Sequence, residues 1–250
     1  MTGAIELESV VKRFGQTVAV DGLSLSIPAG ELFAFLGPNG AGKTTTIKMI
    51  TGLLRPDAGT VTVCGRPMAS DGLAAKSVMA YVPDQPFLYD KLTGREFLDF
   101  VARMYAVPAD RRDRILEELS DRLGMNGFLD QMCDGYSHGM KQKVVITSAL
   151  LHDPKVLVID EPMVGLDPKT VRQVKDLFCE QTARGHTVFM CTHTLEVAEA
   201  VADRIGIIHR GRLIAVGTMA DLRARADRQH SLEDIFLRLT EEQDEPAVRS

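Results

Sequence analysis

The sequence predicts an α/β fold: a mostly parallel β-sheet covered by helices on both faces, an antiparallel β region at the N-terminus and an inserted α-helical subdomain. Three observations support this expectation. Short apolar, β-rich runs alternate with helix-period segments in both halves of the chain. The stretch between those halves has an almost entirely helical pattern. The chain opens with two strands of hairpin character.

Length favours one domain with an insertion. A chain of 250 residues can bury a substantial core, and a typical size of about 100 to 200 residues per domain allows one large domain or two modest ones. We expect a single domain over residues 1–240, with its core at 1–85 and 154–240 and the helical subdomain at 86–153. Residues 241–250 are expected to form a polar C-terminal tail that frays.

Composition limits the partners and the compartment. The formal net charge of -5 leaves no basic footprint, which disfavours a protein that binds nucleic acid. The four cysteines show neither a C-x-x-C pair nor metal-ligand spacing, so we expect reduced thiols in a cytosolic setting and no zinc site. The first 15 residues lack the apolar stretch of a secretory signal, and no run approaches about 18 uncharged apolar residues. A role at a membrane would therefore require a partner.

The N-terminal elements lead into a strand-loop-helix unit. Two strands near residues 4–12 and 18–27 are followed by the apolar strand "ELFAFL" at 31–36. The next segment, "GPNGAGKTTTIKMITGLL", begins with glycine and asparagine, which set a loop, and is expected to continue as a helix as far as Leu54.

The second half of the chain repeats the strand-helix alternation, which argues for a parallel sheet. The expected elements are a strand at 156–159, a helix at 168–184, a strand at 187–191, a helix at 194–202, strands at 204–209 and 212–216, and short C-terminal helices that include "SLEDIFLRLT". Between the two halves, residues 86–153 are almost wholly helical in pattern. There Thr93 and Glu96 form a capping box ahead of a face of apolar side chains.

The strongest chemical signal is "GPNGAGKTT" at residues 37–45, which fits G-x-x-x-x-G-K-[ST] and lies between a strand and a helix. The motif predicts a P-loop NTPase core of the RecA-like type. Gly37, Gly40 and Gly42 allow backbone N–H groups to turn toward phosphate oxygens, and the helix N-terminus adds a partial positive charge. The alternative interpretation is a glycine-rich turn that ends in an ordinary lysine.

Three side chains of the motif have separate expected roles. Lys43 would reach the β and γ phosphates, Thr44 would place its hydroxyl on Mg²⁺, and Thr45 would help hold the phosphates. The ATP-binding residues predicted in this loop are Gly37, Pro38, Asn39, Gly40, Ala41, Gly42, Lys43, Thr44 and Thr45.

Two adjacent acids, Asp160 and Glu161, follow the apolar strand at 156–159. Unpaired buried charges are costly, and a cation bound beside an anionic substrate would explain both carboxylates. Asp160 would then hold the metal through water, with Thr44 as a second ligand. Glu161 is already past the strand and would act on an attacking water as its general base or orienter. The alternative is a plain turn before Pro162.

A second motif gives the chain a family resemblance that covers nearly its whole length. "YSHGMKQK" at residues 136–143 stands where the ATP-binding subunits of ABC transporters have their LSGGQ signature, and Ser137 and Gly139 match that signature. The departures are Tyr136, His138 and Met140, in place of leucine, the first glycine and glutamine. Similar departures are typical of the drug-exporter and ABC-2-like branch, which this sequence resembles.

The signature has a physical role that is independent of the family. Ser137 can cap a helix that continues to Leu151, and an exposed helix N-terminus is an anion site. The resemblance implies that this segment contacts the γ-phosphate of ATP held by the P-loop of a second subunit, so that two chains sandwich two nucleotides. The residues involved would be Ser137, His138, Gly139 and Met140. A plain N-cap is the alternative.

Three further positions match the family pattern. The resemblance implies that Phe14 in "KRFG" stacks on adenine, although a lone phenylalanine is more often a core residue. Asp167 in "GLDP" corresponds to the D-loop that crosses the dimer interface, and it is also a natural N-cap before Pro168. His193 corresponds to the histidine that contacts the γ-phosphate and holds the catalytic geometry. A structural histidine is the alternative for this residue.

The Q-loop departs from the family pattern. In "AYVPDQPFLYDKLT", alignment on Tyr81 and Pro83 places Asp84 where the family has glutamine, and a glutamine follows only at Gln85. Asp84 could touch Mg²⁺ or the attacking water through its carboxylate. Either residue could fill the Q-loop role, and the stretch 84–92 would contact the membrane subunit.

The resemblance implies an ATPase that uses ATP and Mg²⁺ and drives transport, with export favoured over import. Its partners would be a transmembrane permease and a second ATPase subunit, identical or different, at the cytoplasmic face of the cell membrane. A nucleotide-sensing module that does not hydrolyse ATP is one alternative. A non-transport ABC ATPase working on DNA or ribosomes is another, although this chain has one P-loop and no heptad run. A GTPase is disfavoured because no N-K-x-D motif is present.

Overall fold

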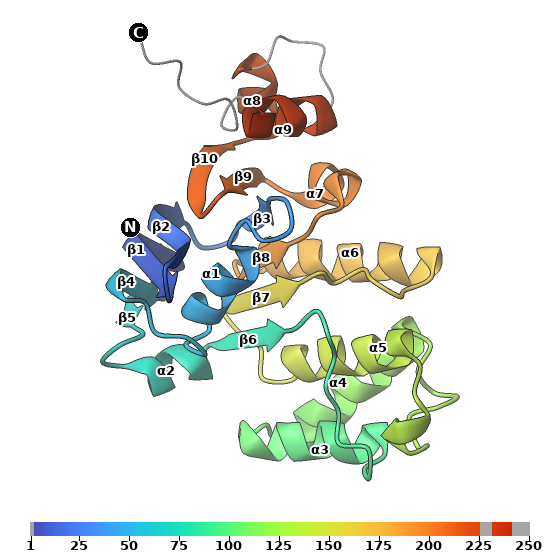
Figure 1. Ribbon diagram of the computed structural model, residues 1–250. Coiled ribbons are helices and arrows are strands. Elements are labelled where there is room, and N and C mark those ends of the chain that lie inside the picture. Colours follow the sequence, from blue (N-terminus) through green and yellow to red (C-terminus); the bar gives the residue numbers. More distant parts are fainter. Residues whose placement is uncertain (1–2, 226–231, 242–250) are drawn as a thin grey trace, which may run out of the picture.

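The computed structural model describes residues 3–225 and 232–241, and within these ranges the chain forms two β-sheets and a group of helices. Figure 1 shows the arrangement: a small sheet that contains the N-terminal strands lies on one side of a larger central sheet. Helices α3 (Gly94–Met104), α4 (Ala109–Arg122) and α5 (His138–Leu150) lie together below the central sheet in this view. The predicted α/β fold with an antiparallel N-terminal region is confirmed.

The smaller sheet is antiparallel, with strand order β2-β1-β4-β5. Its strands are β1 (Ile5–Phe14), β2 (Thr17–Ile27), β4 (Ala58–Val63) and β5 (Arg66–Pro67). The predicted hairpin joins β1 to β2 through a tight turn at Gly15, which has a left-handed φ of 58°. The sequence analysis did not assign β4, whose first three residues are exposed and carry no apolar signal.

The central sheet has the order β10-β9-β3-β8-β7-β6, and all its pairs are parallel except the edge pair of β10 with β9. The strands are β3 (Leu32–Leu36), β6 (Met79–Val82), β7 (Val156–Asp160), β8 (Thr187–Cys191), β9 (Arg204–His209) and β10 (Arg212–Gly217). Every residue of β3, β7 and β8 is buried, because both faces of the sheet are covered. Continuous apolar runs therefore mark these central strands.

Side-chain alternation along β3 divides the interior into two cores. Leu32 and Leu36 point into one apolar cluster, whereas Phe33 and Phe35 point into the other. The second cluster lies between the two sheets and encloses α1 (Lys43–Ile50), whose buried side chains contact both. Helix α1 is thereby held rigidly behind the loop that precedes it.

The predicted extension of the first helix to Leu54 is wrong. Helix α1 ends at Ile50, because Gly52 adopts a left-handed φ of 66° and reverses the chain. The backbone N–H of Leu54 then returns to the carbonyl of Lys48 at 2.9 Å.

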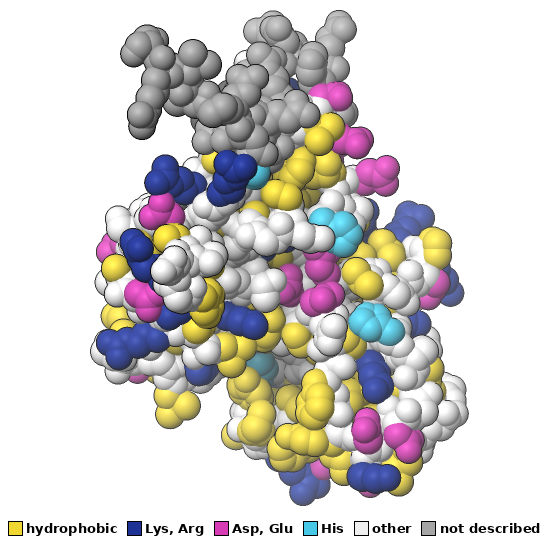
Figure 2. All heavy atoms as spheres, viewed as in Figure 1, with side chains coloured by type: hydrophobic (Ala, Val, Ile, Leu, Met, Phe, Trp, Pro, Cys, Tyr) yellow, Lys and Arg dark blue, Asp and Glu magenta, His cyan; other side chains and the backbone are white. Residues whose placement is uncertain are grey.

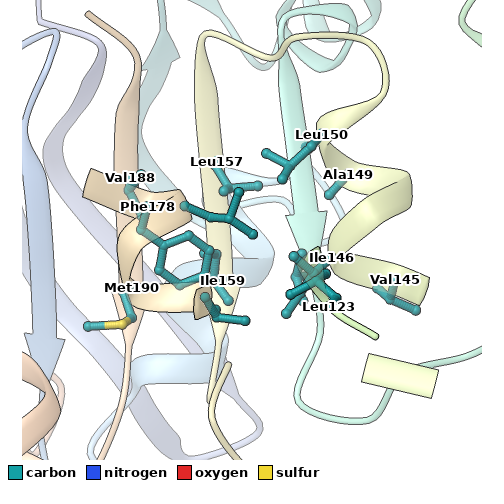
Figure 3. Packing of buried hydrophobic residues seen from close by; sticks show 14 of the residues in the cluster. Leu123, Val145, Ile146, Ala149, Leu150, Leu157, Ile159, Phe178, Val188 and Met190 are labelled. Carbon is teal, nitrogen blue, oxygen red and sulfur yellow. The ribbon is translucent and has the colours of Figure 1, made fainter. Parts of the chain in front are cut away.

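The opposite face of the central sheet packs against helices from the second half of the chain. These are α5 (His138–Leu150), α6 (Pro168–Ala183) and α7 (Leu195–Val201). Figure 3 shows the ring of Phe178 on α6 between side chains of β7 and β8, and residues of α5 facing the same layer. Phe178 is fully buried, so α6 is fixed on the sheet by one of its largest apolar contacts.

Residues 86–153 contain α3 (Gly94–Met104), α4 (Ala109–Arg122), a short 3₁₀ turn η1 (Cys133–Gly135) and α5. The capping box of Thr93 and Glu96 at the start of α3 is confirmed. The expectation that this stretch is almost wholly helical is wrong at 86–93, 105–108, 123–137 and 151–153, which lie outside the α-helices. Pro86 lies in the first of these gaps, and Gly124, with a φ of 64°, lies near the start of the longest one.

The C-terminal part adds α8 (Met219–Arg225) and α9 (Leu232–Glu241) beyond β10. The predicted helix in "SLEDIFLRLT" corresponds to α9, which also includes the first residue of the proposed tail; residues 242–250 lie outside the described part. The sequence analysis also missed β5, β6 and α2 (Gly72–Ser77), three short elements of two to six residues. Among the described residues, no helix combines the length and apolar character needed to span a bilayer.

Candidate nucleotide site

The P-loop joins β3 to α1 and needs its glycines for two different reasons. Gly40 and Gly42 have left-handed φ values of 80° and 110°, which L side chains rarely adopt. Gly37 has an ordinary φ, but a Cβ atom there would lie 2.4 Å from the backbone oxygen of Ile208 on β9. Two glycines therefore set the curvature of the loop, and the third lets the loop pack against the sheet.

The Lys43 ammonium lies within the curve of this loop. Lys43 is 8% exposed, and its Nζ donates hydrogen bonds to the carbonyl oxygens of Gly37 at 2.6 Å and Pro38 at 3.1 Å. Because Gly42 is the N-cap of α1, the ammonium and the first amides of a helix share one concave region. Both contribute positive potential, which suits a phosphate group.

Asp160 ends β7 directly beside the start of α1. The Thr44 hydroxyl donates to Oδ2 of Asp160 at 3.5 Å, although 116 residues separate the two in sequence. Burial, followed by the charges of Glu161 and Asp84, raises the pKa of Asp160 to about 6. The positive charge of Lys43 acts in the opposite direction and lowers this pKa. Asp84, Asp160 and Glu161 together form an electronegative group in the cleft, which a divalent cation would stabilise.

The donor set is suited to a magnesium ion shared with a substrate. In the described part of the chain, no group of three His, Cys, Asp or Glu side chains is arranged to hold a metal. Mg²⁺ normally keeps several waters and binds through one or two carboxylates together with substrate phosphates. A hydroxyl and a carboxylate beside a phosphate-binding loop therefore fit Mg²⁺ better than they fit a metal held by protein ligands alone.

Glu161 follows Asp160 in a constrained conformation. Its φ is 49°, in the left-handed region, and its N–H donates to the Cys191 carbonyl at 2.9 Å. The carboxylate accepts a hydrogen bond from the Thr192 hydroxyl at 3.1 Å, and its other oxygen lies 2.8 Å from Nδ1 of His193. This pairing requires the imidazole proton on Nδ1, and the carboxylate is thereby held in one orientation.

Thr192 was not predicted as a site residue. The sequence signal for Thr192 is its position in "CTHT": it directly follows Cys191, the last residue of β8, and directly precedes His193. The hydroxyl supports Glu161 on one side and accepts a hydrogen bond from the Thr194 N–H at 3.0 Å on the other. Thr192 therefore connects the glutamate to the start of α7.

Lys43, Thr44, Asp160, Glu161 and His193 line one cleft of about 450 Å³ at the carboxyl ends of the central strands. Figure 2 shows acidic side chains gathered at the centre of this face, with histidines close to them. The lining residues are Ala19, Asn39, Gly40, Gly42, Lys43, Thr44, Thr45, Asp84, Asp160, Glu161, Val164 and His193. Asp84 thus belongs to the cleft, whereas Gln85 is exposed and is not among its lining residues.

Other predicted residues lie away from this cleft. Phe14, at the end of β1, is 52% exposed, and the Lys12 ammonium lies 5.7 Å from its ring centre. Ser137 caps α5 by accepting the Met140 N–H at 3.3 Å, as expected from the sequence. The signature residues 137–140 form the exposed or half-buried start of α5, outside the lining of the chain's own cleft.

The signature segment lies against the loop that follows Glu161. A Cβ atom on Gly139 would lie 2.6 Å from the Gly165 carbonyl oxygen, and one on Gly165 would lie 2.6 Å from the His138 ring. Asp167 ends this loop and caps α6, since its side chain accepts the Thr170 N–H at 3.0 Å. The Thr170 hydroxyl is the main cause of a lowered pKa at Asp167.

Comparison with known proteins agrees with this geometry. The profile of the family described as ABC transporter matches residues 20–164. The linearmycin resistance ATP-binding protein LnrL of Bacillus subtilis (strain 168) is 37% identical over 221 residues, which cover 88% of this chain and 71% of that protein. The Nod factor export ATP-binding protein I of Burkholderia lata is 39% identical over 213 residues, covering 85% of this chain and 70% of that protein.

A solved structure described as the ATP-binding subunit of an ABC transporter superposes with a TM-score of 0.91 at 34% identity. The match covers 95% of this chain and 99% of that one, so the likeness includes the helical segment and the C-terminal strands. Fold, sequence and cleft lead to the same assignment: the chain belongs to the ABC transporter family, as an ATP-binding subunit whose hydrolysis of ATP is coupled to transport.

Proposed function

We propose that ATP binds in this cleft together with Mg²⁺, and that two ATPase subunits close around two such nucleotides. The observation that carries the proposal is the meeting of three separate features in one cleft: the P-loop with Lys43, the Thr44–Asp160 pair, and the Glu161–His193 pair. Phosphoryl transfer needs a cradle for phosphates, a place for a metal and a residue that orients water.

Thr44 and Asp160 would hold the metal, and Asp84, which lines the same cleft and whose charge acts on Asp160, would support it. When bound, Mg²⁺ would neutralise charge on the phosphate oxygens and so lower the barrier to attack by water at the γ-phosphorus. Asp84 adds a negative charge where the family usually has an amide, which is expected to change metal affinity. Because Asp84, and not Gln85, lines the cleft, Asp84 is the better candidate for the Q-loop role.

Glu161 would act as the general base. Its carboxylate is held by Thr192 and His193, and it is near enough to the P-loop to line the same cleft. A water oxygen would attack the γ-phosphorus as the bond to the β–γ bridging oxygen breaks, and Glu161 would take the proton of that water. The products are ADP and inorganic phosphate. His193 would orient the carboxylate and contact the γ-phosphate.

The second half of each site would come from the other subunit. Ser137 and its neighbours lie at an exposed helix N-terminus outside their own cleft, as a surface that contacts another chain's phosphate must. Hydrogen bonds to charged groups are worth roughly 1.5 to 3 kcal/mol each, so two donors at each of two sites supply ~6 to 12 kcal/mol gross. Shifting an equilibrium from 1:99 to 99:1 needs ~5.5 kcal/mol. ADP, which lacks the γ-phosphate, would let the dimer open.

The membrane partner would be a permease that docks near residues 84–92. Phe87, Tyr89 and Phe100 are 72%, 48% and 44% exposed and form edge-on ring pairs of about 6 Å, so aromatic surface lies beside the Q-loop. Apolar side chains are gathered below the acidic group in Figure 2. The chain would then sit peripherally at the cytoplasmic face of the membrane. Export is the favoured direction, as in the relative named for Nod factor export.

Phe14 would stack on the adenine ring of the bound ATP.

Steady-state ATP turnover of the full chain tests the proposal. Lys43→Ala should abolish turnover and weaken ATP binding severely. Glu161→Gln should keep ATP binding, lose turnover, and accumulate an ATP-dependent dimer in size-exclusion chromatography with Mg²⁺. Lys48→Ala is the matched control, because Lys48 is an exposed lysine on the same helix that does not line the cleft. Nucleotide binding unchanged within about threefold in Lys43→Ala would refute the assignment of the P-loop. Equal, near-zero turnover in wild type and Glu161→Gln would indicate a sensor.

A further inference from the structure

One buried polar side chain near the cleft has no part in the proposed chemistry. Gln142 lies on α5, one turn beyond the signature residues, and is 0% exposed. Its Nε2 donates to the carbonyl oxygen of Pro162 at 3.3 Å. Its Oε1 is buried without a hydrogen-bond partner among the described residues. A buried amide that is only half satisfied is unfavourable, so the presence of Gln142 at this position calls for an explanation other than stability.

The acceptor explains the position of Gln142. Pro162 directly follows Glu161, and a tight turn starts here, in which the N–H of Val164 lies 3.4 Å from the Glu161 carbonyl. The N–H of Glu161 is already fixed to the Cys191 carbonyl at 2.9 Å. The Pro162 carbonyl is the next polar group along the chain, and Gln142 is the donor that satisfies it. Glu161 is therefore held by β8 on one side and by α5 on the other.

The left-handed φ of Glu161 makes this restraint important. A non-glycine residue at φ 49° is strained and persists only where the surroundings hold it. If the Pro162 carbonyl lost its buried partner, the following peptide could rotate toward solvent and the backbone of Glu161 could relax. The carboxylate would then leave the orientation in which Thr192 and His193 hold it.

We propose that Gln142 is a positioning residue for ATP hydrolysis, which holds Glu161 in its catalytic orientation through the carbonyl of Pro162 and ties it to the signature helix. The inference rests on the proposed role of Glu161 as general base. The signature start of the same helix is close-packed on the same loop, through the near contact of Gly139 with the Gly165 carbonyl. If the nucleotide of a partner subunit displaced the start of α5, the displacement would be transmitted through Gln142 and Pro162 to Glu161 of the same chain.

Gln142→Met tests the proposal in the full chain, because methionine has a similar length and no amide donor. We expect kcat for ATP to fall by about tenfold, the scale for losing one positioning hydrogen bond, while KM and the Kd for a non-hydrolysable ATP analogue stay within about twofold. Thermal stability should change little, because the substitution also removes the unpartnered Oε1. Gln142→Leu replaces the methionine variant if that variant does not fold.

Thr147→Val is the matched control on the same helix. Thr147 is also 0% exposed, and its hydroxyl donates to the Lys143 carbonyl at 2.9 Å, away from the Pro162 loop. It should retain the wild-type kcat. An unchanged kcat in Gln142→Met, a change confined to KM or Kd, or an equal loss of kcat in Thr147→Val would overturn the proposal. ATP turnover of the wild type and of Glu161→Gln is measured in the same experiment. Turnover by the wild type and none by Glu161→Gln would support the role of Glu161 independently of the result for Gln142→Met.

Discussion

Removing the hydroxyl of Tyr136 is expected to loosen the helical segment without touching the P-loop. Tyr136 is 7% exposed, and its hydroxyl lies 2.8 Å from the Phe128 carbonyl and accepts the N–H of Gly94, the first residue of α3, at 3.1 Å. Tyr136→Phe leaves a buried N–H and a carbonyl without this partner. At about 1 to 1.5 kcal/mol per net hydrogen bond, the free energy of unfolding should fall by about 2 kcal/mol.

For a chain of this size, a loss of about 2 kcal/mol lowers Tm by about 4 to 8 °C. Thermal unfolding followed by circular dichroism measures the shift. Tyr89→Phe is the control, since Tyr89 is 48% exposed and makes ring contacts with Phe87, Phe97 and Phe100 that survive loss of the hydroxyl. A Tm for Tyr136→Phe within 1 °C of the wild type, or an equal drop in the control, would refute the reasoning.

Two further outcomes follow from the structure. Gly42 and Gly185 both have a left-handed φ, but only at Gly42 would an added Cβ meet backbone, 2.5 Å from the Ala19 oxygen. Gly42→Ala should therefore lower the free energy of unfolding, measured by urea titration, by about 1 to 3 kcal/mol more than Gly185→Ala does. Equal losses in the two variants would contradict this steric explanation. Burial lowers the pKa of His152 and of His186, so the unfolded chain binds protons that the folded chain rejects, and stability should decline as pH falls below about 6.5. His152→Phe should flatten that decline, and an unchanged pH dependence of Tm would contradict this origin.

Much of the fold was accessible from local sequence pattern. The continuous apolar runs of β3, β7 and β8 indicate strands buried on both faces, and the capping residues Thr93 and Ser137 mark where two helices begin. These signals are reliable because each depends on contacts within a few residues. The same limit explains the missed elements: β6 has only four residues, and the end of α1 depends on the left-handed conformation of Gly52.

The P-loop motif and the adjacent acids also predicted many of the residues that line the cleft. Their types determine what they can do, because a lysine among helix N-terminal amides attracts phosphate and a hydroxyl beside a carboxylate attracts Mg²⁺. Sequence could not decide between Asp84 and Gln85, since the two differ by one position in an irregular segment. The path of the chain after β6 brings Asp84 to the cleft.

The residue types and their order along the chain were enough to predict a phosphate-binding α/β protein. Which residues meet depends on the pairing of strands far apart in sequence: β3 lies between β8 and β9, and β7 lies beside β8. This order places Thr44 against Asp160 across 116 residues, and it places Glu161 against Thr192 and His193. The carboxyl ends of parallel strands share one edge of the sheet, so only the completed sheet brings these groups within hydrogen-bonding distance.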